Sequence, residues 1–120
     1  MNKSGSNQAL GKFGEIEAKN YLLSKGYVLL HQNWRRQYLE VDLIVKKENC
    51  IVFVEVKTRE SNIGNLDEVV SRRKELSLIK ALNIYMNETD EDMLCQIDLV
   101  LVKKEKDLIE IEHVQNAIGM

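Results

Sequence analysis

The sequence predicts an α/β domain in which helices pack against a mixed β-sheet. Two segments carry small or apolar residues at three- to four-residue spacing, which is typical of helices that face a core. Five other segments are short, apolar and rich in β-branched residues, as strands are. The second helical segment lies between the third and fourth strand segments. The fourth strand is therefore expected to enter the sheet parallel to a neighbour.

The first helix is predicted over residues 8–25, after a polar stretch, residues 1–7, that is expected to be a mobile terminus. One stripe of this helix is mostly small and holds a single charge; it consists of Gly11, Gly14, Glu15, Ala18 and Leu22. Small side chains let a helix lie close to a sheet. Glu15 is therefore expected to face the sheet, and Gly26 is suited to end the helix.

Three strands joined by short turns are predicted next, and they form an antiparallel meander. They cover residues 27–33, 39–47 and 50–58, with residues 34–37 as the end of the first strand and its turn. A second helix is expected to be capped by Asn65 or Asp67 and to reach about Asn87. Two more strands, 94–102 and 108–114, and a short helical tail over residues 115–120 complete the predicted order.

The composition is that of an ordinary globular protein, and it limits the partners. The 120 residues, 44% apolar and 30% charged, suffice for one domain, predicted over residues 1–120. The net charge of −2 argues against bulk coating of DNA. Residues 1–60, however, hold 10 Lys+Arg against 7 Asp+Glu, a net of +3, which leaves room for a local basic groove. Without a stretch of membrane-spanning length or a signal-peptide core, a cytoplasmic protein with no membrane association is expected.

The segment Ile51–Arg59 is the most unusual of the predicted strands. Its apolar residues are typical of a strand buried on both faces, yet it contains Glu55 and Lys57. Residues two apart on a strand point to the same side, so a carboxylate and an ammonium project together from a central strand. Because burying charge is costly unless the charge is paired or binds a metal, these residues indicate a site.

Asp42 and Glu15 are expected to add two carboxylates beside Glu55 and Lys57. Asp42 precedes the turn at residues 46–49 by about as many residues as Glu55 follows it, which makes the two near neighbours across antiparallel strands. Opposed carboxylates repel unless a cation lies between them. A hard divalent ion with oxygen ligands, Mg²⁺ or Mn²⁺, fits this set best.

Two simpler interpretations compete with a metal site. Glu-Val-Lys at strand spacing is, taken alone, usually a solvated face, and the charges could instead form an internal ion-pair cluster. The coincidence of all these charges on otherwise apolar elements favours the metal site over a solvated face. An ion-pair cluster is disfavoured because the carboxylates of Glu15, Asp42 and Glu55 outnumber the single Lys57.

The order of these residues matches a known pattern. Glu15, then Asp42, then Glu55-Val56-Lys57 resembles the PD-(D/E)xK nuclease superfamily, whose restriction-endonuclease-like fold has an αβββαβ core with a mixed central sheet flanked by helices. Over residues 9–118 the chain more closely resembles the YraN-like family of bacterial proteins. That likeness rests on residues Gly11–Ala18, Gly26–Tyr27, Asn33–Arg35, Glu40–Ile44, Phe53–Arg59 and Ile111–Val114. The family is similar to archaeal Holliday-junction resolvases.

The resemblance implies a role for each charged residue. Asp42 and Glu55 would bind Mg²⁺ (or Mn²⁺) together with the backbone carbonyl of Val56, and Glu15 would complete the metal site directly or through water. Lys57 would position the attacking water, so Glu15, Asp42, Glu55 and Lys57 are the catalytic candidates. For Glu40, a supporting contact to the site and a plain salt bridge both stay open.

Basic residues near the predicted site are candidates for holding a nucleic-acid backbone; they are Arg35, Arg36, Arg59, Arg73 and Lys74. For the cluster on the second helix, a solvated face is the simpler alternative. Trp34 could stack on a base, although packing beneath the meander is the simpler interpretation. His31 and His113, without partners at ligand spacing, are interpreted as ordinary strand residues.

The function implied is that of a metal-dependent endonuclease that hydrolyses phosphodiester bonds in DNA, including branched or structured DNA. The alternative is a nucleic-acid-binding module of the same fold with little or no catalytic activity. An intact set of ligand residues favours the enzyme. Many nucleases of this fold that cut twice act as dimers, so a homodimer is a candidate assembly, with Phe13, Ile16 and Leu23 as its candidate face.

Overall fold

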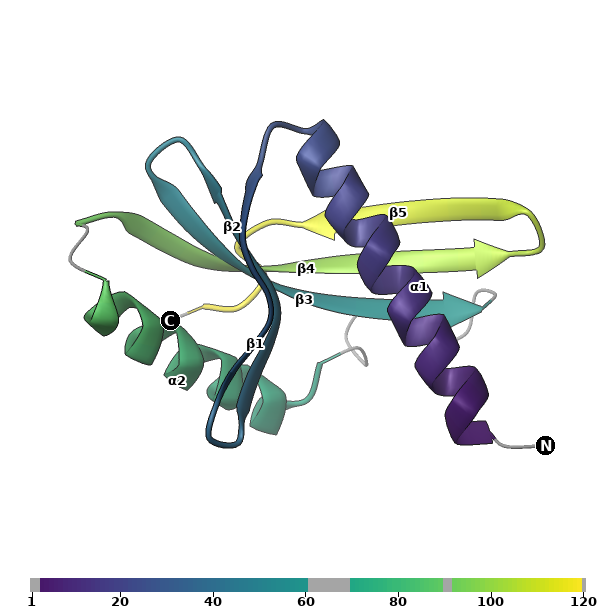
Figure 1. The fold of residues 1–120 in the computed structure, drawn as a ribbon, viewed down its shortest axis with the longest axis horizontal. Helices are drawn as coiled ribbons and strands as arrows, with labels where there is room; N and C mark the ends of the chain where they lie inside the picture. Colours follow the sequence, from purple (N-terminus) through teal and green to yellow (C-terminus); the bar gives the residue numbers. More distant parts are fainter. Residues whose placement is uncertain (1–2, 61–69, 90–91, 120) are drawn as a thin grey trace.

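The computed structural model describes residues 3–60, 70–89 and 92–119 (Figure 1). Within these ranges the chain forms two helices and a five-stranded sheet, in the predicted order. The helices are α1 (Lys3–Ser24) and α2 (Arg72–Glu88), and the strands are β1 (Val28–Arg36), β2 (Leu39–Lys47), β3 (Cys50–Glu60), β4 (Leu94–Glu105) and β5 (Leu108–Val114). Among the described helices, none has the length and apolarity needed to cross a membrane.

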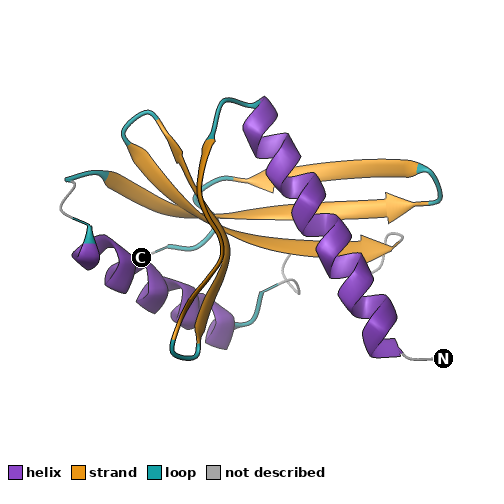
Figure 2. Cartoon of the chain, in the orientation of Figure 1, coloured by secondary structure: helices purple, strands orange, loops and turns teal. Residues whose placement is uncertain are grey.

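The sheet is mixed, as predicted, and its strands lie in the order β1-β2-β3-β4-β5. Figure 2 shows the strands in orange and the two helices in purple. β1, β2 and β3 form the antiparallel meander, and β4 pairs with β5 as an antiparallel hairpin. β3 and β4 run parallel, which confirms the crossover inferred from the helix between them. A mixed five-stranded sheet flanked by two helices agrees with a restriction-endonuclease-like αβββαβ core.

Two apolar clusters cover the two faces of the sheet. Ala18 and Leu22 of α1 pack with Val52 and Val54 of β3, whereas Phe53 belongs to a second cluster. That second cluster contains the buried residues of α2: Leu78, Ala81, Leu82 and Tyr85. Because neighbouring residues of a strand point to opposite sides, α1 and α2 cover opposite faces of β3. β3 is thus enclosed on both faces, as its apolar run predicts.

β2 leaves β3 at Asp42. The backbone pairing of the two strands runs from Lys47–Cys50 to Leu43–Val54, and no further pair follows it among the described residues. Val41, just beyond this point, packs in the cluster of α2, whereas Leu43 packs in the cluster of α1. Figure 1 shows β1 and β2 curving together away from β3 toward α2. The separation exposes one edge of β3 next to Glu55.

A buried polar network joins distant parts of the chain. Asp98 on β4 is fully buried; its Oδ2 lies 2.7 Å from Nε2 of His113 on β5, and its Oδ1 accepts from the backbone N–H of Asn116. The Tyr21 hydroxyl of α1 lies 3.3 Å from Nδ1 of the same imidazole. With its proton on Nε2, His113 donates to Asp98 and accepts from Tyr21. His113 is therefore more than the ordinary strand residue predicted.

Several predicted boundaries differ from the structure. α1 begins at Lys3 rather than at residue 8. Residues 3–7, which were predicted to be part of a mobile terminus, therefore belong to the helix. α2 begins at Arg72, and its cap is Ser71, whose hydroxyl accepts from the Lys74 N–H at 3.1 Å. The predicted caps Asn65 and Asp67 lie outside the described residues.

The remaining differences concern strand ends and the tail. β1 continues through Arg36 because residues 34–36 pair with residues 39–41 of β2 around a two-residue turn. β3 extends past its predicted end to Glu60 because it remains paired with β4, and β4 extends to Glu105, which pairs with Leu108 of β5. The predicted helical tail is wrong for the described residues 115–119, which contain a turn at residues 115–116 and one bend at Ile118. In that tail, Ile118 is buried in the cluster of α2.

Candidate active site

Where β2 separates from β3, the side chain of Asp42 takes the place of a backbone partner for β3. The Val56 backbone N–H, which lies beyond the last backbone pair that the described residues of β2 and β3 form, donates to Asp42 Oδ2 at 2.8 Å. A hydrogen bond from a backbone N–H to a carboxylate is stronger than one between neutral groups, and it fixes the position of the carboxylate. Asp42 and Glu55 are thus brought together, as their spacing from the turn predicts.

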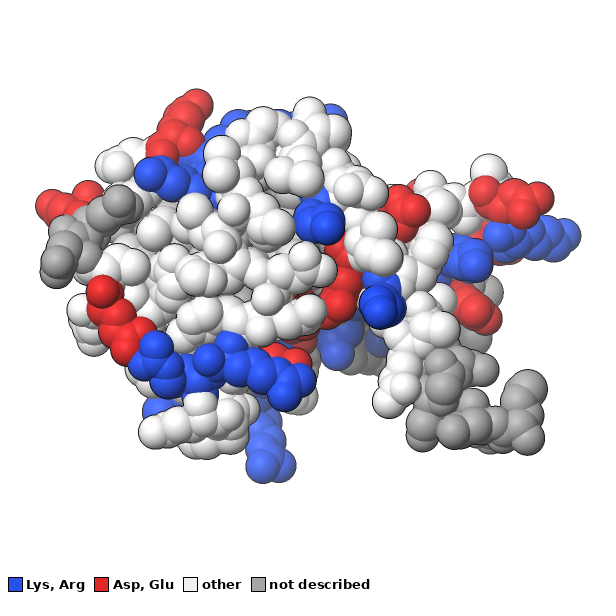
Figure 3. All heavy atoms as spheres, viewed as in Figure 1, with Lys and Arg blue, Asp and Glu red and all other residues white. Residues whose placement is uncertain are grey.

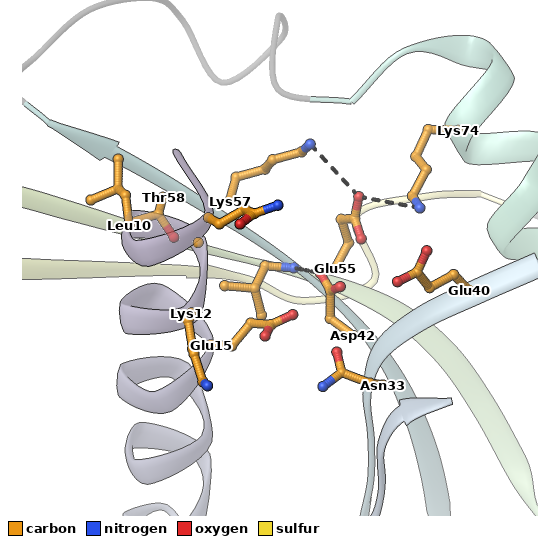
Figure 4. A pocket seen from close by; sticks show the side chains of 13 residues that line it. Leu10, Lys12, Glu15, Asn33, Glu40, Asp42, Glu55, Lys57, Thr58 and Lys74 are labelled. Carbon is orange, nitrogen blue, oxygen red and sulfur yellow. Dashed lines mark hydrogen bonds and ion pairs between the residues drawn. The ribbon is translucent and has the colours of Figure 1, made fainter. Parts of the chain in front are cut away.

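A cleft of about 660 Å³ opens at this edge (Figure 4). It receives side chains from five elements, and its lining residues are Gln8, Leu10, Gly11, Lys12, Glu15, Asn33, Glu40, Asp42, Glu55, Val56, Lys57, Thr58 and Lys74. Figure 3 shows acidic side chains in the hollow between α1 and the neighbouring part of the molecule, with basic side chains beside them. All four catalytic candidates line this one cleft.

Glu55 is the most buried charged group of the cleft, with 3% of its surface exposed. Burial, followed by the negative charge of Asp42 and a hydrogen bond with it, raises the pKa of Glu55 to about 8. Two cations act in the opposite direction, since Nζ of Lys74 lies 3.8 Å and Nζ of Lys57 lies 4.0 Å from Glu55 Oε2. Burial and Asp42 thus disfavour ionisation of the Glu55 carboxyl, and the two lysines partly offset this effect.

Glu15 reaches the cleft because α1 lies unusually close to β3. A Cβ on Gly14 would stand 1.7 Å from Thr58 Oγ1, so only glycine permits this approach. Burial is the largest cause of the raised pKa of Glu15, followed by the charge of Asp42, a hydrogen bond with it and the charge of Glu40. Asp42 thus raises the pKa of both glutamates, and the three carboxyls lie in one site (Figure 4).

The chemistry of this donor set suits a hard cation. Among the described residues, no group of three or more His, Cys, Asp or Glu side chains forms a ready-made metal cage. Mg²⁺ does not require one, because it is usually held by one or two carboxylates and keeps several waters. Asp42 and Glu55, with Val56 beside them in the cleft lining, fit that requirement. Glu15 fits a contact made through water.

Of the five basic residues predicted to hold a nucleic-acid backbone, Lys74 lines the cleft, and Arg35, Arg36, Arg59 and Arg73 do not. Lys57 and Lys74 line the cleft, and Lys74 is the member of the α2 cluster that enters it. Arg35 pairs with Glu40 at 3.2 Å, and Arg36 pairs with Glu88. Arg59 is absent from the lining, although it continues the strand face of Glu55 and Lys57.

The structure gives contacts for the residues whose roles the sequence left open. Glu40 makes the salt bridge with Arg35 and also lines the cleft. Trp34 packs against the core, with its ring centroid 5.9 Å from that of Tyr85. Of the candidate dimer face, Ile16 and Leu23 are exposed, whereas Phe13 packs on the cluster of α1.

Sequence reasoning missed Asn33 and Lys12 as lining residues. Asn33 adopts a left-handed backbone conformation with φ of 52°, which asparagine tolerates better than most residues. An asparagine within a predicted strand was the available signal. Lys12 lies three residues before Glu15, so helical spacing alone places it on the same side of α1.

The fold and the cleft define a restriction-endonuclease-like α/β protein with a carboxylate site at the edge of its central strand. The chain belongs to the uncharacterised protein family UPF0102, the YraN family, whose model matches residues 14–102. A UPF0102 protein of Flavobacterium psychrophilum is 42% identical over 109 residues, covering 90% of this chain and 92% of the relative. One from Syntrophomonas wolfei is 40% identical over 113 residues, covering 92% and 98%. The resemblance to the YraN-like family is thereby confirmed.

Proposed function

We propose that this protein is a metal-dependent endonuclease that hydrolyses phosphodiester bonds in DNA. The observation that carries the proposal is the buried Glu55, which faces Asp42 on one side and the ammonium groups of Lys57 and Lys74 on the other. A site with competing charges of this kind is costly for stability, and such sites cluster where chemistry is performed. The resemblance to PD-(D/E)xK nucleases supports the same reaction.

Each residue has a defined task in this proposal. Asp42, Glu55 and the Val56 carbonyl would hold Mg²⁺, which when bound polarises the phosphate and lowers the pKa of water. Lys57, 42% exposed along its side chain, reaches from Glu55 toward the open cleft and would orient the attacking water and stabilise charge on the phosphate. Lys74 would hold a phosphate oxygen from the side of α2. Glu15 would position water between α1 and Asp42.

The test is a cleavage assay on duplex, single-stranded and four-way-junction DNA with Mg²⁺ or Mn²⁺. Glu55→Gln, which keeps the side-chain size, and Lys57→Ala are each expected to lower the cleavage rate by about 10²-fold or more. Glu110→Gln on β5 is the matched control, since Glu110 is exposed and absent from the cleft lining. Cleavage that survives Glu55→Gln unchanged would contradict the proposal, and tight binding without cleavage of any DNA would replace it with a binding module.

A further inference from the structure

A second hollow, of about 640 Å³, adjoins the cleft at Lys74, which lines both. It lies between the tip of the β1–β2 hairpin and the first half of α2. Its lining residues are Tyr38, Leu39, Ser71, Arg73, Lys74, Leu76, Ser77 and Lys80. A nucleic-acid strand bound in the cleft can therefore continue past Lys74 into this second hollow.

Tyr38 presents an aromatic ring to solvent at the hairpin tip. It is 71% exposed, whereas the aromatic residues Tyr27, Phe53 and Tyr85 are buried. Nζ of Lys80 donates to the Tyr38 hydroxyl at 2.5 Å and lies 5.1 Å from the ring centroid. These contacts orient the ring while most of its surface stays accessible. An oriented, exposed aromatic ring is a platform on which a planar group can stack.

The charge of this hollow is complementary to phosphate. Its lining contains Arg73, Lys74 and Lys80 but no carboxylate. Within the described part of the chain, no acidic side chain forms an ion pair with Arg73 or Lys80. Figure 3 shows basic side chains along the edge of the molecule near the hairpin and α2. The neighbouring cleft, by contrast, is lined by four carboxylates as well as three lysines.

We infer that the hollow binds an unpaired nucleotide, whose base stacks on Tyr38 while Arg73, Lys74 and Lys80 hold the adjoining phosphates. Bases inside a duplex stack on each other and offer only their edges, so the face of a tyrosine ring needs an unpaired base. The inference rests on the proposed function and narrows it. The preferred substrate carries a single-stranded segment beside the phosphate that enters the cleft.

Binding is measured by fluorescence anisotropy in EDTA, where no cleavage interferes. The probes are a thymidine strand of about 12 nucleotides and an abasic strand of equal length, which has the phosphates but no bases. The wild type is expected to bind the thymidine strand at least about five-fold more tightly than the abasic one. Tyr38→Ala should abolish this preference, and Tyr38→Phe, which keeps the ring, should retain it. Leu108→Ala, at an equally exposed apolar site on β5, is the control.

Three results would overturn the inference: equal binding of both strands by the wild type, a preference that persists in Tyr38→Ala, or a Tyr38-dependent dimer in sedimentation that covers the ring. Circular dichroism excludes misfolding of the variant. A parallel assay with Mg²⁺ compares cleavage of a forked duplex with that of a blunt duplex, and Tyr38→Ala should bring this ratio close to one. A base preference without any cleavage contradicts the endonuclease alone, whereas cleavage without a base preference contradicts only this inference.

Discussion

At the scale of single residues, Glu55 shows how an apolar strand can carry a buried carboxyl. The strand around it is apolar and enclosed, and burial of the carboxyl together with Asp42 raises its pKa to about 8. Lys57 and Lys74 compensate for part of the cost of ionisation. Removal of Lys57 or Lys74 is therefore expected to change the pKa of Glu55.

The stability of the metal-free protein is expected to fall as pH rises from about 4.5 to about 8, because folded Glu55 keeps a proton that the unfolded chain releases. The slope from this residue is at most about 1.4 kcal/mol per pH unit, and it vanishes below and above the window. Glu55→Gln should lack this component. Its free energy of unfolding in urea, relative to wild type, should therefore increase from pH 5 to pH 8. A constant difference would show that Glu55 is already ionised in the fold.

Lys74→Ala is expected to extend the upper end of that window to higher pH. The Lys74 ammonium, 3.8 Å from Glu55 Oε2, favours the ionised carboxylate, so its loss raises the pKa of Glu55 further. Urea denaturation of Lys74→Ala at closely spaced pH values detects the shift as a decline in stability that ends at higher pH. Lys25→Ala, just past the end of α1, is the control and should leave the window where it is in wild type.

At the scale of elements, the position of α1 depends on a single missing methyl group. Gly14 faces Thr58 on β3, and a Cβ there would overlap Thr58 Oγ1. The same helix carries Gly11, where a Cβ would meet nothing within 4 Å. The two glycines thus provide an internal comparison.

Gly14→Ala is expected to destabilise the protein by about 1–3 kcal/mol, because α1 must move outward or Thr58 must turn away. Gly11→Ala should be neutral or stabilising by up to about 1 kcal/mol, as expected for replacing a helical glycine with space to spare. Thermal unfolding of both variants measures the contrast. The explanation would be contradicted by equal effects at the two sites. Thr58→Ala, which removes the overlapping hydroxyl, should restore part of the loss when it is combined with Gly14→Ala.

At the scale of the whole molecule, the Asp98 network connects both ends of the chain. The carboxylate on β4 holds His113 on β5 and the backbone of Asn116, and the imidazole meets Tyr21 of α1. Every polar partner of this buried carboxylate would lose its contact at once if the side chain were removed. The network is therefore expected to stabilise the packing of α1 and β5 on the sheet.

Asp98→Ala is expected to cost about 3–5 kcal/mol of folding free energy, because it leaves buried donors unpaired. Asp107→Ala, in the exposed turn between β4 and β5, should change stability by no more than about 0.5 kcal/mol. Guanidinium denaturation at neutral pH compares the two variants. A small effect of Asp98→Ala would show that water can replace the carboxylate.

Local spacing along the chain was enough to predict the class of fold and the centre of the site. Helical periodicity and apolar strands defined the element order. The spacing of Asp42 and Glu55 from one short turn placed them opposite each other, since hairpin pairing depends only on local chain length. Glu15 was located by the small-residue stripe of its helix. Such features follow from periodicity and are readable in a single chain.

The completion of the site, by contrast, follows from tertiary packing. The departure of β2 from β3 frees the Val56 N–H for Asp42, and this bend depends on how Leu39 and Val41 pack against α2. Lys74 lines the cleft because α2 begins directly after its cap, Ser71. His113 is buried against Asp98 because β4, β5 and α1 pack together. These arrangements arise from packing between residues far apart in the chain, which local spacing does not specify.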